Sequence, residues 1–127
     1  MQNEASFWDR LRRTRGNVFL TLSDSNPGKN TVVDVLDECL FVQSLRARPR
    51  PRREITHHDL YLIYSAVWDR GRITLQEIQP LTELGQQREQ RLGNGSALLG
   101  LLLHAFPEEL TKDNHGREVG LRTKDRP

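Results

Sequence analysis

Few residues in the chain have the types and spacing that catalysis or metal binding requires. His57 and His58 are adjacent where we expect a helix to begin, and neighbouring helical side chains point about 100 degrees apart, so the two rarely bind one ion. The glycines of residues 93–97 are wrongly placed for a nucleophile elbow, and residues 26–30 carry one glycine before the lysine, unlike a phosphate-binding loop. We therefore expect a non-enzymatic protein with no catalytic residue, metal site or cofactor.

Cys39 is the single cysteine of the chain, which excludes an internal disulfide and a multi-cysteine zinc site. It lies in the apolar run of residues 39–42, so we expect a buried core thiol rather than a reactive one. No stretch approaches the roughly 18 apolar residues of a membrane span, and the first residues lack a charged segment followed by an apolar one. These features predict a cytoplasmic protein without a membrane partner.

Arginine is the residue type that points to a partner. Sixteen arginines and three lysines make up the 19 basic residues, against 17 acidic residues, so the formal net charge is only +2. Because a guanidinium group pairs bidentately with phosphate and stacks on bases, an arginine-rich surface suits nucleic acid or an acidic protein face. A GC-rich coding sequence produces the same bias without functional meaning, and that alternative stays open.

Five of these arginines lie within residues 46–53, where two prolines exclude a helix and like charges repel one another. We expect a loop or an edge strand that can follow phosphates or enter a minor groove, as basic arms do. Arginines of an N-terminal helix would add a second basic patch if that helix lies near the run, and a solvated loop without a partner is the alternative. The candidate nucleic-acid-binding residues are Arg12, Arg13, Arg46, Arg48, Arg50, Arg52 and Arg53.

The first part of the chain predicts a helix followed by three strands. Ser6 is a candidate N-cap for a helix that ends at Gly16. Residues 18–22 alternate apolar and hydroxyl side chains, and the runs 31–36 and 39–44 are β-branched or apolar with a tight hairpin between them. Together these runs predict a three-stranded antiparallel meander.

Helical patterns follow the arginine run. Thr56 begins the strongest one, in which apolar residues recur at helical spacing until Gly71. Thr74 and Glu77 form a capping box for a short helix, and residues 96–106 form an apolar helix. The sequence therefore predicts a C-terminal layer of two or three helices.

The expected fold is α+β: the N-terminal helix, the meander, and the helical layer packed on one face of the sheet. We expect one domain over residues 1–110 and a disordered tail over residues 111–127, since the tail has few large apolar side chains. The expected core consists of Leu60, Ile63, Tyr64, Val67, Leu98, Leu101, Leu102 and Phe106 against Val33, Val35, Leu40 and Val42.

Three segments carry a resemblance to a known class of domain: residues 21–22, 71–78 and 94–107. With the order of helix, meander and helices, they resemble small winged-helix-like accessory domains of prokaryotic restriction and mobile-element proteins. The resemblance carries over no catalytic residue, and the arginine run departs from it. The helix in the reader position, residues 97–105, has no Arg, Lys, Asn or Gln for base edges, so we do not expect direct readout.

Two hypotheses about function remain. The first is an accessory or regulatory domain that contacts DNA or RNA through arginine-rich surfaces, by phosphate contacts and shape. The second is a protein-interaction or homodimerisation module, in which the apolar C-terminal helix or the faces around Trp8 and Trp68 are the contact surfaces. Salt discriminates between them, because phosphate binding weakens steeply with ionic strength and apolar association does not.

Overall fold

The computed structural model describes residues 1–23, 27–45, 51–78, 94–115 and 118–124. Its helices are α1 (Glu4–Arg12), α2 (His57–Arg70), α3 (Leu75–Ile78) and α5 (Asn94–Ala105). Its strands are β1 (Val18–Leu20), β2 (Lys29–Val35), β3 (Cys39–Ser44), β4 (Arg53–Thr56), β5 (Arg72–Thr74), β6 (Leu110–His115) and β7 (Glu118–Thr123). The expected α+β class is confirmed.

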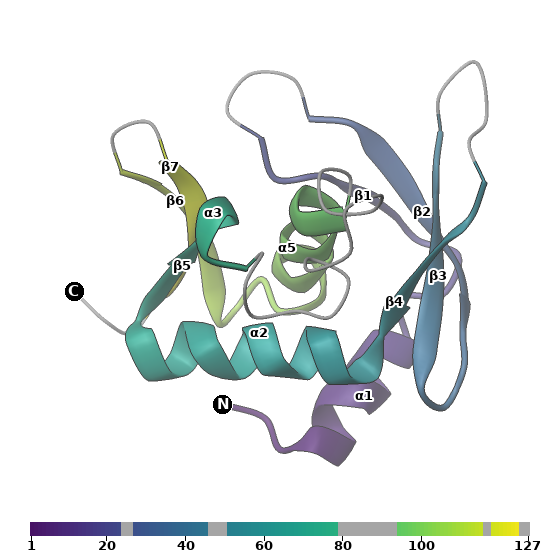
Figure 1. The fold of residues 1–127 in the computed structure, drawn as a ribbon. Helices are drawn as coiled ribbons and strands as arrows, with labels where there is room; N and C mark the ends of the chain where they lie inside the picture. Colours follow the sequence, from purple (N-terminus) through teal and green to yellow (C-terminus); the bar gives the residue numbers. More distant parts are fainter. Residues whose placement is uncertain (24–26, 46–50, 79–93, 116–117, 125–127) are drawn as a thin grey trace.

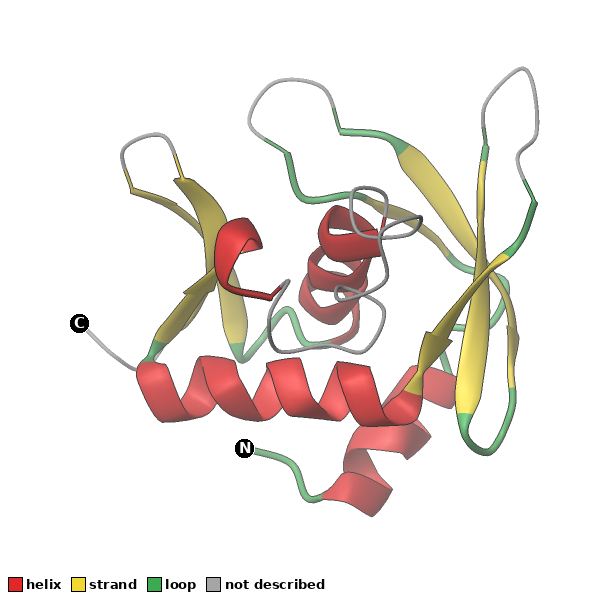
Figure 2. Ribbon diagram, in the orientation of Figure 1, coloured by secondary structure: helices red, strands yellow, loops and turns green. Residues whose placement is uncertain are grey.

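Two antiparallel sheets lie on either side of α5, and α2 runs along one end of both (Figure 1, Figure 2). Sheet A has the strand order β1-β2-β3-β4, and sheet B has the order β5-β7-β6. Helix α5 contacts strands of both sheets as well as α2. Because α5 is apolar on nearly all sides, it fills the interior between the sheets. The helices therefore do not form one layer on one face of one sheet, as we expected.

Sheet A contains one strand more than the expected meander. Strands β1, β2 and β3 form that meander, and β4 then pairs with β3 directly after the arginine run. Ile55 of β4 lies opposite Leu40 in the core. It is the only large apolar residue of this short strand, so the alternation is too brief to indicate a strand. The expectation of three strands is thus corrected to four, with β1 and β4 as the edges.

A β-bulge in β2 changes which of its valines face the core. The register with β3 shifts between Val32 and Asp34, and Val32 is fully buried whereas Val33 is only partly buried. An extra residue in one strand interrupts the alternation of its side chains. The expected core position of Val33 is therefore wrong, and Val32 takes it, while Val35 packs partly buried against the core. The other expected core residues are buried: Leu40, Val42, Leu60, Ile63, Tyr64, Val67, Leu98, Leu101, Leu102 and Phe106.

The C-terminal segment contributes two strands of sheet B, where we expected a disordered tail over residues 111–127. Strands β6 and β7 pair with each other, and Leu121 of β7 lies opposite Ile73 of β5. Val119 and Leu121 are 5% and 0% exposed. Few apolar side chains suffice here because α2 and α5 supply the surface against which β7 packs. The expectation of disorder is wrong for the described part of this segment.

Capping residues set the ends of α1 and α2. Asn3, rather than Ser6, caps α1, and its Oδ1 accepts a hydrogen bond from the Ser6 backbone N–H at 2.9 Å. Thr56 caps α2 as expected, since its Oγ1 accepts from the Asp59 backbone N–H at 3.1 Å. Gly71 ends α2 with a φ of 85°, a left-handed conformation that favours glycine.

Candidate functional site

The arginine run connects β3 to β4 at one end of sheet A. Arg46, Arg48 and Arg50 lie outside the described residues. Arg53 begins β4, and its Nη2 donates a hydrogen bond to Asn30 Oδ1 of β2 at 3.1 Å. Arg52 is exposed and forms no ion pair with a described residue. Of the two described arginines of the run, Arg53 therefore links strands, while Arg52 is open to a partner.

Three arginines at the end of α1 and in the turn after it, Arg12, Arg13 and Arg15, are each offset by a carboxylate. The ion pairs are Arg12–Asp37 at 3.1 Å, Arg13–Asp9 at 3.4 Å and Arg15–Asp34 at 3.4 Å. All six side chains are well exposed, so the pairs add little to stability. Their consequence is electrostatic, since each positive charge has a negative neighbour.

The two groups of arginines lie at opposite ends of sheet A. Asp37, the partner of Arg12, lies in the hairpin that precedes Cys39 at the start of β3. The arginine run follows the other end of β3, and a strand of six residues spans about 17 Å. Figure 1 shows α1 near the hairpin end of sheet A, whereas the last residues of β3 and the first residues of β4 lie at the far end. The structure therefore does not bring Arg12 and Arg13 to the run.

An apolar patch that we did not expect lies on sheet A, at the same end as the arginine run. Val18, Leu20 and Leu45 are 50%, 52% and 51% exposed. Lys29 lies between the two leucines, because it pairs with Leu20 and its carbonyl accepts a hydrogen bond from the Leu45 N–H at 2.9 Å. We call these four residues the outer patch. Its signal in the sequence is the unbroken apolar run Val18–Leu20, because successive side chains of a strand face opposite sides and only Phe19 of β1 is buried.

The described residues contain no metal-binding cluster. Their His, Cys, Asp and Glu side chains form no group of three or more that could hold a metal ion. His57 instead stacks on Trp8, with ring centroids 4.4 Å apart and 12° between the ring planes. This contact packs α2 against α1.

Cys39 is half-buried at the start of β3, and not in the core as we expected. Partial burial raises the pKa of the Cys39 thiol, and Glu54 raises it further by accepting a hydrogen bond from it. A raised pKa lowers the fraction of nucleophilic thiolate at neutral pH. The structure therefore favours an unreactive thiol.

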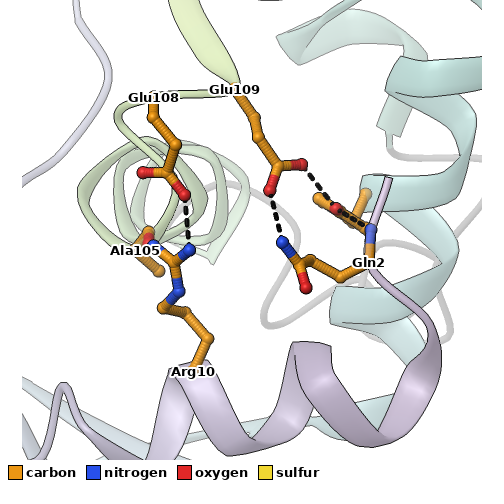
Figure 3. A network of polar contacts seen from close by, with 6 residues as sticks. Gln2, Arg10, Ala105, Glu108 and Glu109 are labelled. Atoms are coloured by element: carbon orange, nitrogen blue, oxygen red, sulfur yellow. Dashed lines mark hydrogen bonds and ion pairs between the residues drawn. The ribbon is translucent and has the colours of Figure 1, made fainter.

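Polar side chains tie the N-terminal segment to the turn after α5 (Figure 3). The Gln2 backbone N–H donates to the Tyr64 hydroxyl at 2.6 Å, and that hydroxyl donates to Glu109 Oε1 at 2.6 Å. Gln2 Nε2 donates to Glu109 Oε2 at 2.9 Å, and Arg10 of α1 forms an ion pair with Glu108. These groups satisfy one another, and the network joins the N-terminal segment and α1 to the turn after α5.

Replacing Tyr64 by phenylalanine is expected to lower the free energy of unfolding by about 1–2 kcal/mol, because a buried hydroxyl with two partners is removed. Burial, and then Glu109, raise the pKa of Tyr64. Since an unfolded tyrosine ionises near pH 10, stability from this group is complete below about pH 10 and is lost at higher pH. Urea unfolding at pH 7 and above pH 10 measures both effects.

Tyr61→Phe is the matched control for that variant. The Tyr61 hydroxyl lies 3.4 Å from the Gln2 carbonyl, a poor hydrogen bond, so its loss should change the free energy of unfolding by less than about 0.5 kcal/mol. Equal losses in the two variants would show that the cost of Tyr64→Phe does not come from the hydrogen bonds of its hydroxyl with Gln2 and Glu109.

No family model matches the chain, and no curated protein and no solved structure matches it. The resemblance to winged-helix-like domains therefore stays a prediction. None of the helices in the described ranges is long and apolar enough to cross a membrane.

Proposed function

We propose that this chain is a non-enzymatic accessory or regulatory domain that contacts nucleic acid at the arginine-run end of sheet A. Charge pairing carries the proposal. Arg12 and Arg13 are each offset by a carboxylate, whereas the exposed Arg52 and Lys29 form no ion pair with any described side chain. Cations that no carboxylate of the described residues offsets are free to replace counterions on a phosphate backbone.

The proposed contact is with phosphates and not with base edges. If the predicted resemblance to winged-helix-like domains holds, α5 is the helix in the reader position, but Leu98, Leu101 and Leu102 are at most 3% exposed. A helix that packs between two sheets is not presented to a major groove. Arginines on a loop or edge strand suit backbone contact, which tolerates any base sequence.

Fluorescence anisotropy with labelled duplex and single-stranded DNA, at about 50 mM and about 200 mM salt, tests the proposal. We expect binding at the lower salt and a loss of about tenfold or more at the higher salt, because several phosphate contacts release counterions. Absence of binding to both forms at about 50 mM salt would refute nucleic-acid contact.

The outer patch favours a second candidate, a protein-interaction or homodimerisation module. Val18, Leu20 and Leu45 each expose about half of their surface around Lys29, and a group of exposed apolar residues is a common feature of interaction surfaces. Apolar association of this kind persists at high salt. Sedimentation of the chain at about 50 mM and about 1 M salt tests this second candidate. Dimers that persist at the higher salt support it, and a monomer at both salt concentrations excludes homodimerisation.

A further inference from the structure

An open groove of about 680 Å³ lies where α1, the β2–β3 hairpin and α2 meet. This volume is in the range of small-molecule sites, about 300–1,000 Å³. The groove is distant from the arginine run, because the hairpin and the run lie at opposite ends of β3. Its lining residues are Glu4, Glu38, Thr56, His57, His58, Tyr61, Leu62 and Ser65.

Two carboxylates from different elements give the groove its charge. Glu4 comes from the first turn of α1 and Glu38 from the hairpin. Neither forms an ion pair with a residue in the described ranges. The N-terminal end of α2 carries a partial positive charge, but the buried Asp59 carboxylate in its first turn offsets it. The groove is therefore suited to a cation.

The wall along α2 is long and partly apolar. His57, Tyr61 and Ser65 are spaced four residues apart and so lie on one face of the helix, with Leu62 beside them. Eight residues of helix extend about 12 Å. Tyr61 and Leu62 are half-buried, so their side chains offer methylene groups a surface between the polar ends. An aromatic ring also attracts an adjacent cation.

Contacts among the three elements hold the groove in shape. The Trp8 ring stacks on His57, and Trp8 Nε1 donates to the Leu36 carbonyl at 2.9 Å. The His57 backbone N–H donates to the Glu38 carbonyl at 2.8 Å. Each pair of elements is therefore joined directly, so ligand binding requires little loss of conformational entropy to order the site.

We propose that this groove binds an aliphatic amine, with its ammonium group at Glu4 and Glu38 and its methylene chain along Tyr61 and Leu62. The described residues form no group that could hold a metal ion, so an organic cation fits the two carboxylates better. The same ammonium and chain occur in a lysine side chain of a partner protein and in a free polyamine. This site is independent of nucleic-acid contact.

Titration of the ¹⁵N-labelled chain with 1,5-diaminopentane, followed by NMR, tests the proposal. We expect amide shift changes at the lining residues of α2 at amine concentrations up to about 10 mM. The double variant Glu4→Gln/Glu38→Gln should weaken binding about tenfold, since each exposed ion pair is worth up to roughly fivefold. 1,5-Pentanediol, which has the chain without the charge, should bind much more weakly.

Asp37→Asn is the matched control, because Asp37 neighbours Glu38, is 95% exposed and pairs with Arg12 outside the groove. It removes one negative charge next to the groove, whereas the double variant removes two inside it, and it should change affinity less than about twofold. Melting curves of all variants check that they fold. No shift changes in the groove, equal affinity of the double variant and the parent, or an equal loss in Asp37→Asn would each overturn the proposal.

Two further ligands distinguish the sources of the amine. Tighter binding of Nα-acetyl-lysine methylamide than of spermidine identifies a lysine side chain of a partner protein. Tighter binding of spermidine identifies a free polyamine, because its additional ammonium groups strengthen the attraction to the same two carboxylates.

Discussion

Replacing Gly100 by alanine is expected to lower the free energy of unfolding by about 3 kcal/mol, at the upper end of what overpacking costs. A Cβ atom at this position would lie 2.1 Å from the Leu20 carbonyl oxygen and 2.9 Å from Thr21 Cα. These are backbone atoms of β1 and the residue after it, so they cannot rotate away as a side chain does. The substitution should destabilise even though alanine favours a helix by about 1 kcal/mol over glycine.

Gly100 matters because α5 lies directly against the end of β1. The Leu22 backbone N–H donates a hydrogen bond to the Ser96 carbonyl of α5 at 2.9 Å. Helix α5 thus covers an edge of sheet A that would otherwise present unpaired backbone groups. Moving α5 outward to make room for a methyl group would stretch this hydrogen bond and loosen the apolar interior on its other sides.

Gly95→Ala is the matched control in the same helix. Its Cβ would meet the ends of two side chains, Ile78 Cδ1 at 3.2 Å and Leu75 Cδ2 at 3.8 Å, which can move by a few tenths of an ångström. We expect its stability to stay within about 1 kcal/mol of the parent. Urea unfolding of both variants measures the difference, and equal stabilities would show that α5 does not approach β1 as closely as described.

The elements that depend on short-range patterns were predictable from the sequence. Thr56 and Gly71 bracket α2 because a side-chain cap and a left-handed glycine act within one helical turn. The hairpin between β2 and β3 follows from two residues between two β-rich runs. Tyr64 and Val67 were placed in the core by helical spacing alone.

Sheet B and β4 were not predictable, because their partners are distant in the sequence. Ile73 of β5 packs opposite Leu121 of β7, and each strand shows too few apolar residues for a period to be recognised. The bulge at Val32 depends on the register between two strands, which no local pattern reveals. Tertiary contacts with α2 and α5 decide these elements.

The candidate site was only partly predictable for the same reason. The arginine run is visible in composition, but its distance from Arg12 depends on the hairpin that places Asp37 beside α1. The outer patch requires the pairing of Leu20 with Lys29, which a sequence does not display. The residue types therefore indicated contact with phosphates, and the strand pairing in sheet A determines which of these residues lie on one surface.

The variant Arg12→Ala/Arg13→Ala/Arg15→Ala is the control for the arginine run, since it removes three positive charges from the other end of sheet A. Each of these arginines is paired with an acid, so its loss should leave the slope of log affinity against log salt within about 1 of the parent. The comparison separates the position of the arginines from the net charge of the chain.

Replacing Arg48, Arg50 and Arg52 together by alanine is expected to weaken binding to duplex DNA similarly for all base sequences, because phosphate contacts position a protein without specifying bases. Removing one arginine–phosphate pair from the complex with duplex DNA reduces the log-log salt slope by about 0.9, so removing three reduces it by roughly 2.7. Losing the Arg52 side chain should hardly change the free energy of unfolding, because this side chain is exposed. Anisotropy titrations across several salt concentrations measure the slope. Unchanged binding would mean that any nucleic-acid contact lies outside the arginine run. An equal change of the slope in the control variant would mean that the net charge of the chain, and not the position of its arginines, determines the affinity.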